Sequence, residues 1–167
     1  MFYLACTRFN CNTSQENINY KIKNNIKGIL YGVPILIYNK YPLNTILFVV
    51  EMNNETNEIL GIGIIRNKIV IDKKYCIYNN LEYNRYIYKG DYWLSREYIL
   101  RNNEKVIEIL ENILFKKKSN VKRQSGITII TQKVWSHWKD YDNYTEKFLK
   151  DSIKKLFIKE FMNQIII

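Results

Sequence analysis

The stretch "LFVVEMNNETNEILGIGII", residues 47–65, decides which kind of fold the chain can form. It contains Gly-Ile-Gly after an apolar run, which occurs both in phosphate-binding loops and in glycine-containing hairpins. A dinucleotide-binding loop needs a third glycine three residues after the second, with a helix beginning there. Residue 66 is an arginine, and no Gly-Lys-Ser/Thr stands at the spacing of a P-loop. The stretch therefore predicts a β-hairpin and not a nucleotide-binding loop.

The two strands of this hairpin differ in how their faces are expected to be covered. The near-continuous apolar run at 45–52 predicts a central strand covered on both faces. Residues 53–58 form the predicted turn, and 59–67 the returning strand. Gly61 and Gly63 fall on one face of that strand and leave it without side chains. We expect a packed helix to approach the backbone there, with a flat ligand as the alternative.

Outward from the hairpin, short apolar and aromatic runs predict further strands at 2–6, 33–38, 74–78 and 127–131, and two within 83–95 around the turn at Lys89–Asp91. Helical periodicity predicts helices at 102–115 and from about 142 to 162. An earlier helix is predicted to begin with a capping box of Thr13 and Glu16, to pack through Ile18, Ile22 and Ile26, and to stop at Gly28.

These elements predict an α/β chain of the α+β type. We expect a single domain over residues 1–167, built on a curved mixed sheet or open barrel flanked by about three helices. Residues 142–163 would form a C-terminal helix packed on that domain. The length of 167 residues is enough for one hydrophobic core.

Composition narrows the function classes. No apolar run reaches the 18 residues of a membrane span, and the N-terminus lacks the pattern of a secretory signal. Cys6, Cys11 and Cys76 with the single His137 make a poor metal set, so we expect reduced thiols and no metal. An intracellular location follows, in cytoplasm or nucleus. The abundance of Asn, Ile, Lys and Tyr is typical of an AT-rich genome, such as that of a large DNA virus. A location in a viral factory or a virion is therefore a further possibility.

Charge and aromatic content point to nucleic acid. Lys and Arg number 26 against 16 Asp and Glu, a net charge of +10, and 14% of residues are aromatic. Single-stranded nucleic acids are bound by aromatic rings that stack on bases and by cations that neutralise phosphates. His137 lies between Trp135 and Trp138, outside any nucleophile motif, so no catalytic group and no cofactor is predicted. The two tryptophans are expected to anchor the C-terminal helix.

Several short stretches resemble the YTH domain, a PUA-like fold that reads N6-methyladenosine in RNA. In that family a strand leads into a helix that ends in Ile-Lys-x-x-x-Trp, and Ile26, Lys27 and Tyr31 stand at those steps. A hairpin with Phe/Cys-Gly-Val/Ala follows, matched by Leu60-Gly61-Ile62, and Trp-x4-Trp-Lys-Gly is matched by Tyr83, Tyr88, Lys89 and Gly90. A later basic segment is similar to "VKRQSGITI", with Arg123 and Gly126. The resemblance spans roughly residues 2–131.

The resemblance implies a non-enzymatic reader of single-stranded RNA or DNA. An aromatic cage of Tyr31, Tyr83 and Tyr88 would hold one modified base, with tyrosines in place of the family's tryptophans and therefore a weaker cage. Polar groups near the base edge would come from Thr7, Asn10 and Asn12. Phosphates would be bound by the cations Lys89, Lys116, Lys117, Lys118, Lys122 and Arg123.

Two alternatives stay open at this stage. The related EVE and ASCH families share the architecture, and some ASCH-type members hydrolyse modified nucleosides. A basic structural protein that condenses nucleic acid without base preference would have the same composition. The sequence leaves the base, the choice of RNA or DNA, and the oligomeric state open.

Overall fold

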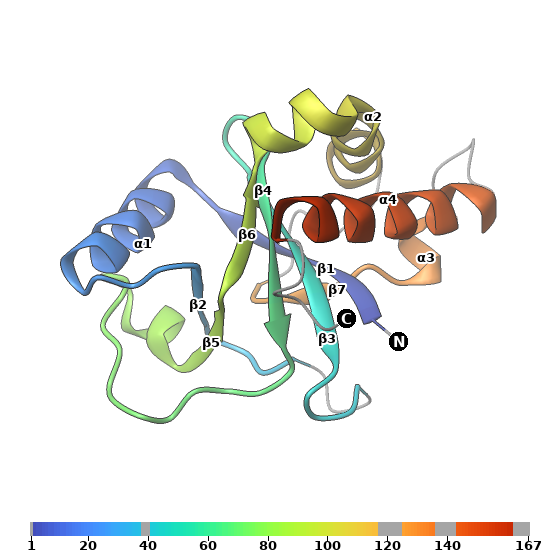
Figure 1. Ribbon diagram of the computed structural model, residues 1–167. Coiled ribbons are helices and arrows are strands. Elements are labelled where there is room, and N and C mark those ends of the chain that lie inside the picture. The colour runs from blue at the N-terminus through green and yellow to red at the C-terminus, as the bar shows by residue number, and fades with distance from the viewer. Residues whose placement is uncertain (1, 38–40, 117–124, 136–142, 162–167) are drawn as a thin grey trace.

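A computed structural model of the chain describes residues 2–37, 41–116, 125–135 and 143–161. It has the predicted α+β character, with five strands in one mixed sheet and two in a second, smaller sheet (Figure 1). The strands are β1 (Phe2–Phe9), β2 (Ile29–Val33), β3 (Ile46–Asn53), β4 (Glu58–Arg66), β5 (Tyr86–Gly90), β6 (Tyr92–Ser95) and β7 (Thr128–Ile129). The helices are α1 (Cys11–Lys23), α2 (Arg96–Phe115), α3 (Gln132–Trp135) and α4 (Asn143–Phe161), with a 3-10 turn, η1, at Leu81–Asn84.

The larger sheet has the strand order β6-β4-β3-β1-β7 and contains the predicted hairpin at its centre. β3 and β4 are antiparallel, as the hairpin requires, whereas β1 and β3 are parallel. The pairing of β3 with β4 shifts between Glu51 and Met52, which leaves Leu60 as the extra residue of a bulge. β2 and β5 form the smaller antiparallel sheet, in which Tyr31 pairs with Tyr88.

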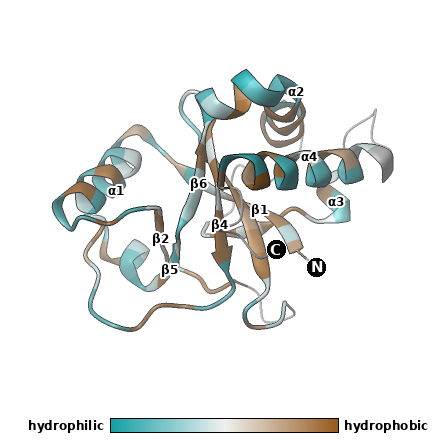
Figure 2. Ribbon diagram, in the orientation of Figure 1, coloured by the Kyte–Doolittle hydropathy of each residue, from teal (hydrophilic) through white to brown (hydrophobic). Residues whose placement is uncertain are grey.

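Two hydrophobic cores lie on opposite faces of the larger sheet. α2 and α4 cover one face, while α1, β2 and β5 lie on the other (Figure 1). Alternate residues of β3 divide between them, with Phe48 and Val50 on the helical side and Leu47 and Val49 on the side of β2 and β5. β3 is therefore covered on both faces, as its apolar run predicted, and the central strands are brown in Figure 2. The buried Trp135 packs in the helical core, also as predicted; Trp138 and His137 lie outside the described residues.

The bare face of β4 is covered by the smaller sheet, and the expected helix or flat ligand at this position was wrong. A Cβ atom on Gly63 would lie 2.4 Å from Ile29 Cδ1 and 2.6 Å from the Tyr31 hydroxyl. One on Gly61 would lie 2.6 Å from Trp93 Nε1. One on Gly90 in β5 would lie 1.8 Å from the carbonyl oxygen of Ile64. The glycines thus let β2, β5 and the Trp93 ring approach the backbone of β4 directly.

The first helix differs from its prediction in both cap and face. Asn10 is the N-cap and forms a reciprocal capping box with Thr13, so the Thr13–Glu16 box was wrong. The helix stops at Lys23, before Gly28. Ile18 and Ile22 are exposed, Ile22 by 74%, whereas the polar Asn17 is buried. Asn17 can be buried because both of its amide hydrogens are used in hydrogen bonds, described below.

Two predicted strands were placed wrongly. The strand expected at 33–38 is β2 at Ile29–Val33, which ends just before Pro34, a residue with no N–H to continue the pairing. Residues 74–78 are not a strand. The side-chain oxygen of Asn84 accepts the N–H groups of Ile77 and Tyr78 instead, at 2.8 and 2.9 Å. The other predicted strands are confirmed in their approximate positions, as are the helices at 102–115 and 142–162 within the described residues.

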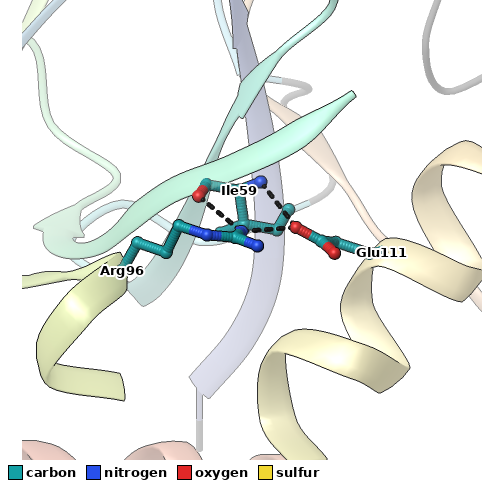
Figure 3. Close-up of polar contacts among 3 residues, drawn as sticks. All are labelled: Ile59, Arg96 and Glu111. Carbon is teal, nitrogen blue, oxygen red and sulfur yellow. Dashed lines mark hydrogen bonds and ion pairs between the residues drawn. The ribbon is translucent and has the colours of Figure 1, made fainter. Parts of the chain in front are cut away.

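Two side chains of α2, Arg96 in its first turn and Glu111 in its second half, close the edge of β4 where β6 ends. β6 pairs with β4 only from Gly61 to Ile64, so Ile59 lies beyond its reach. The Arg96 guanidinium donates to the Ile59 carbonyl oxygen at 3.0 Å and pairs with Glu111, whose carboxylate accepts the Ile59 N–H at 3.2 Å (Figure 3). Non-helical backbone at Asn103 kinks α2 between Arg96 and Glu111. The Arg96 and Glu111 side chains thus form the hydrogen bonds with the Ile59 backbone that a neighbouring strand would otherwise form. None of the described helices is apolar over a length that could cross a bilayer.

Replacing Glu111 by alanine should destabilise the fold. The change leaves the Ile59 N–H and the partly buried Arg96 guanidinium without their shared acceptor, at a cost of about 1–3 kcal/mol in the free energy of unfolding. Urea denaturation followed by circular dichroism measures this loss. Glu108→Ala, at an exposed position of the same helix, should change stability by much less. Equal stabilities of the two variants would contradict the role given to Glu111.

Candidate functional site

A pocket of about 300 Å³ opens where the ends of β1 and β2 meet the beginning of α1. Segments far apart in the sequence contribute its lining: Thr7–Asn10 and Thr13, Tyr31–Pro34, Asn54, Tyr78 and Tyr83, and Ser125–Gly126. Its volume is at the lower end of the range for ligand sites, which suits one flat ring system better than an extended ligand.

Three tyrosines and Phe9 form the aromatic part of the lining. Tyr31 and Tyr78 are almost fully buried, whereas Tyr83 is only partly buried. The rings of Tyr78 and Tyr83 meet edge to face, with centroids 6.0 Å apart and planes at 88°. An edge-to-face contact fixes the orientation of Tyr83, so the exposed ring rests against a buried one.

Buried hydrogen bonds hold this aromatic wall in place. The side-chain amide of Asn17 donates to the Leu30 carbonyl oxygen at 2.7 Å and to the Tyr78 hydroxyl at 3.0 Å. Burial raises the pKa of Tyr78, so its hydroxyl stays protonated. Gly32 also contributes, because a Cβ atom at this position would lie 2.4 Å from the Tyr83 carbonyl oxygen. The buried Asn17 side chain of α1 therefore holds the aromatic wall of the pocket in position.

The opposite part of the lining is polar. Asn10 uses its side-chain oxygen to cap α1 by accepting the Thr13 N–H at 2.7 Å, which leaves its amide nitrogen available to a ligand. The Thr7 hydroxyl makes no hydrogen bond with any described residue. Arg8 donates to the Ser125 hydroxyl at 3.3 Å. These groups offer hydrogen-bond donors and one cation beside the aromatic wall.

Behind Tyr31 lies a buried carboxylate, Glu51 of β3, which is only 9% exposed. The Tyr31 hydroxyl donates to one of its oxygens at 2.8 Å, and Trp93 Nε1 donates to the other at 3.0 Å. Burial raises the pKa of Glu51, while the two hydrogen bonds lower it in part. Both donors are neutral, so Glu51 is a buried acid held by dipoles. It fixes Tyr31 from within the core.

The structure brings four of the residues selected from the sequence to this pocket: Thr7, Asn10, Tyr31 and Tyr83. It does not bring Tyr88 there. That side chain is buried in the core, and its hydroxyl accepts the Ile37 N–H at 3.2 Å. Tyr31 and Tyr88 pair across β2 and β5, but β2 lines the pocket only from Tyr31 toward Pro34, whereas the Tyr88 ring packs in the core of the smaller sheet.

The remaining selected residues lie elsewhere. Asn12 is exposed on α1 and is not part of the lining. Lys89 lines a different groove, 3.9 Å from an Asp72 oxygen and 5.1 Å from the centre of the Tyr75 ring. Lys116 is exposed at the end of α2. The other four cations, Lys117, Lys118, Lys122 and Arg123, lie outside the described residues.

Sequence reasoning missed Tyr78, Asn17 and Glu51. Tyr78 was assigned to a strand, and Asn17 stands in a helix whose apolar residues suggested another buried face. Glu51 follows the apolar run of β3, and it had a usable signal. A carboxylate inside a strand covered on both faces must be paired or protonated, which marks it as a structural or functional group.

Comparison with protein-family models, with curated proteins and with solved structures finds no match to this chain.

Stability should depend on pH through Glu51. The folded protein holds the Glu51 proton more tightly than the unfolded chain, in which this group titrates at its ordinary 4.5. Ionisation therefore costs stability as the pH rises from about 4.5 through the raised pKa. Glutamine keeps a carbonyl for Trp93, offers its N–H to the Tyr31 oxygen, and does not ionise. Glu51→Gln should thus gain stability relative to the wild type as the pH rises.

Urea midpoints of the two proteins between pH 4.5 and pH 8 measure this difference. Glu58→Gln, at an exposed position on β4, is the matched control and should show a constant difference from the wild type. A difference between Glu51→Gln and wild type that does not change with pH would contradict the buried-acid interpretation.

Proposed function

We propose that this chain binds single-stranded RNA and receives one base, N6-methyladenine, in the pocket between β1, β2 and α1. The observation that carries the proposal is the meeting of Thr7, Asn10, Tyr31 and Tyr83 in one pocket. These four residues are separated by up to 76 positions in the sequence. The resemblance to the YTH domain places Tyr31 and Tyr83 on its motif, and Asn10 and Thr7 only near its base-edge position. The proposal inherits its choice of base from that resemblance.

The lining suits an unpaired base. Tyr83 supplies the more accessible ring, on which a base stacks with a gain of about 1–3 kcal/mol. Tyr31 and Tyr78 close the apolar side, where a methyl group makes contact with ring faces. The Asn10 amide and the Thr7 hydroxyl reach the edge of the base, where ring nitrogens accept hydrogen bonds. The affinity of such a pocket depends on all three kinds of contact.

The lining also favours binding over hydrolysis. Among the described lining residues there is no carboxylate, histidine, lysine or cysteine, so hydroxyls at the pocket have no general base beside them. Glu51, the nearest acid discussed above, has both oxygens occupied by Tyr31 and Trp93. A nucleoside hydrolase of the ASCH type would need a proton-transferring group that this part of the lining does not provide.

The charge of the chain supports a nucleic-acid ligand. Arg8 places a cation at the pocket, and Ser125 and Gly126 bring the end of the basic segment 116–126 to the same place. The net charge of +10 adds an attraction that does not depend on base sequence. Affinity should therefore have two parts, one from phosphates that falls with salt, and one from the pocket that does not.

Fluorescence anisotropy with two single-stranded RNAs tests the proposal. The strands are identical except for an N6-methyl group on one adenine, and each is titrated at 50 mM and 200 mM salt. We expect tighter binding of the methylated strand at both salt concentrations, on top of a loss of affinity with salt that both strands share. Equal affinity for the two strands would refute the methyl-reading part. A salt-insensitive affinity would refute the phosphate part.

Tyr83→Ala should weaken binding of the methylated strand by about 5- to 150-fold, because it removes the accessible stacking surface. Tyr83→Phe keeps the ring and should bind within about twofold of the wild type. Tyr98→Ala, which truncates a partly buried tyrosine on α2 outside the lining, controls for a general effect of losing an aromatic side chain. Equal losses in Tyr83→Ala and Tyr98→Ala would exclude a specific stacking role.

A further inference from the structure

A second and larger concavity, of about 710 Å³, lies at the other end of the sheet. It is formed where β3 begins, where β4 ends, and where β5 turns into β6, and the segment 68–72 makes one wall. It shares no lining residue with the pocket that contains Tyr31 and Tyr83. We call it the β4–β5 groove.

The interior of the groove is aliphatic. Ile46, Ile64 and Ile65 come from the two central strands, and Ile69 and Ile71 come from the wall. Ile71 is 85% exposed and Ile69 37% exposed, so apolar side chains stand at the opening as well as inside. Ile64 and Ile65 are buried, so the apolar surface that the groove exposes comes from Ile69 and Ile71, with the half-buried Ile46 and Val70 beside them. Such a surface gains free energy when an apolar group covers it.

The two walls are anchored to the fold. The Val70 N–H donates to the Ile87 carbonyl oxygen on β5 at 2.8 Å, and the Lys68 N–H donates to the Arg66 carbonyl oxygen at 2.7 Å. On the other side, Gly90 lets β5 pass so close to Ile64 that a Cβ atom would not fit. A groove with anchored walls exists before its ligand arrives, which lowers the cost of binding.

Cations surround the aliphatic interior. Arg66 and Lys68 line the groove, are exposed, and make no ion pair with a described residue. Lys89 is 3.9 Å from an oxygen of Asp72, which also accepts the Tyr75 hydroxyl at 2.9 Å, so this cation is already paired within the lining. Lys73 and Lys74 follow directly on the wall segment. Asp91 is the other acid in the lining, so the surroundings carry an excess of positive charge.

We propose that the β4–β5 groove is a docking site for an acidic peptide segment of a partner protein, one whose carboxylates alternate with branched aliphatic side chains. The aliphatic side chains pack against Ile46, Ile69 and Ile71, and the carboxylates pair with Arg66 and Lys68. Bases would find no aromatic platform here except the partly buried Tyr92, so the lining fits a peptide better than nucleic acid. A concave groove fits an inserted chain better than a flat lipid surface.

This proposal does not depend on the RNA-binding proposal. Because the two concavities lie at opposite ends of β3 and β4 and share no residue, a base in one and a peptide in the other can be bound together. The protein would then connect a nucleic acid to an acidic partner, with each site keeping its own selectivity.

A phage-displayed library of random dodecapeptides, selected on the folded protein, tests the docking site. We expect enrichment of peptides in which Asp or Glu alternates with Ile, Leu or Val. Synthetic copies should bind the wild type in anisotropy titrations and bind Ile71→Asp and Lys68→Glu at least tenfold more weakly. Both positions are exposed, so these variants should fold, which circular dichroism checks. Lys154→Glu, on α4 away from the groove, is the charge control and should bind as the wild type does.

Three results would overturn the proposal: no enriched peptide, enriched peptides without the acidic and aliphatic pattern, or equal binding to the wild type and both groove variants. Sedimentation with vesicles of phosphatidylserine and phosphatidylcholine provides a further arm. Vesicle binding that is lost in Ile71→Asp, without peptide binding, would assign the groove to a membrane. Tyr83→Ala must keep its peptide affinity, which separates failure here from failure of the RNA-binding proposal.

Discussion

The close packing of the smaller sheet on β4 is the constraint on which the rest of the structure depends. Gly61 and Gly63 remove side chains from one face of β4, and Gly90 removes one from β5, so that Ile29, Tyr31 and Trp93 lie almost on the β4 backbone. A side chain at Gly63 or Gly90 would push the two sheets apart, and one at Gly61 would displace the Trp93 ring of β6. The pocket and the β4–β5 groove both form at the borders of this contact, so their shapes depend on it.

The same contact explains why a carboxylate is buried in the centre of the fold. Glu51 lies opposite Gly61 on the neighbouring strand, and the missing side chain leaves room for the Tyr31 hydroxyl and the Trp93 N–H to reach its two oxygens. Each donor belongs to a different sheet, since Tyr31 is on β2 and Trp93 is on β6. The acid thus ties the smaller sheet to the larger one, at the cost of desolvation that raises its pKa. A purely apolar contact would hold the sheets together but would not fix the orientation of the Tyr31 ring.

Sequence patterns predicted those parts of the fold in which local residues decide the structure. The hairpin of β3 and β4 follows from an apolar run, a polar turn and two glycines, and the kinked α2 still shows its helical periodicity over 102–115. The face of α1 could not be predicted. Ile18, Ile22 and Ile26 have the spacing of a buried stripe, but Asn17 is buried instead because Leu30 and Tyr78, distant in sequence, accept its hydrogens. Four pocket residues were predicted, Tyr31 and Tyr83 from motif positions and Thr7 and Asn10 as polar groups near the expected base edge. Tyr88 stands in the same motif and pairs with Tyr31, yet it is buried in the core, where its hydroxyl accepts the Ile37 N–H, a contact that no local pattern predicts.

The strand directions in the mixed sheet place two different sets of side chains at its two ends. Because β1 and β3 are parallel, their carboxyl ends lie together at the beginning of α1, where Thr7, Asn10 and Asn54 meet. The antiparallel β4 carries its own carboxyl end to the opposite edge, where Arg66 and Lys68 stand. The first end gathers amides and hydroxyls around tyrosine rings, and the second gathers cations around isoleucines. A base is recognised by directional hydrogen bonds and stacking, whereas an acidic aliphatic chain needs only charge and apolar area. The two ends therefore differ in the chemical groups they present, and not only in their position.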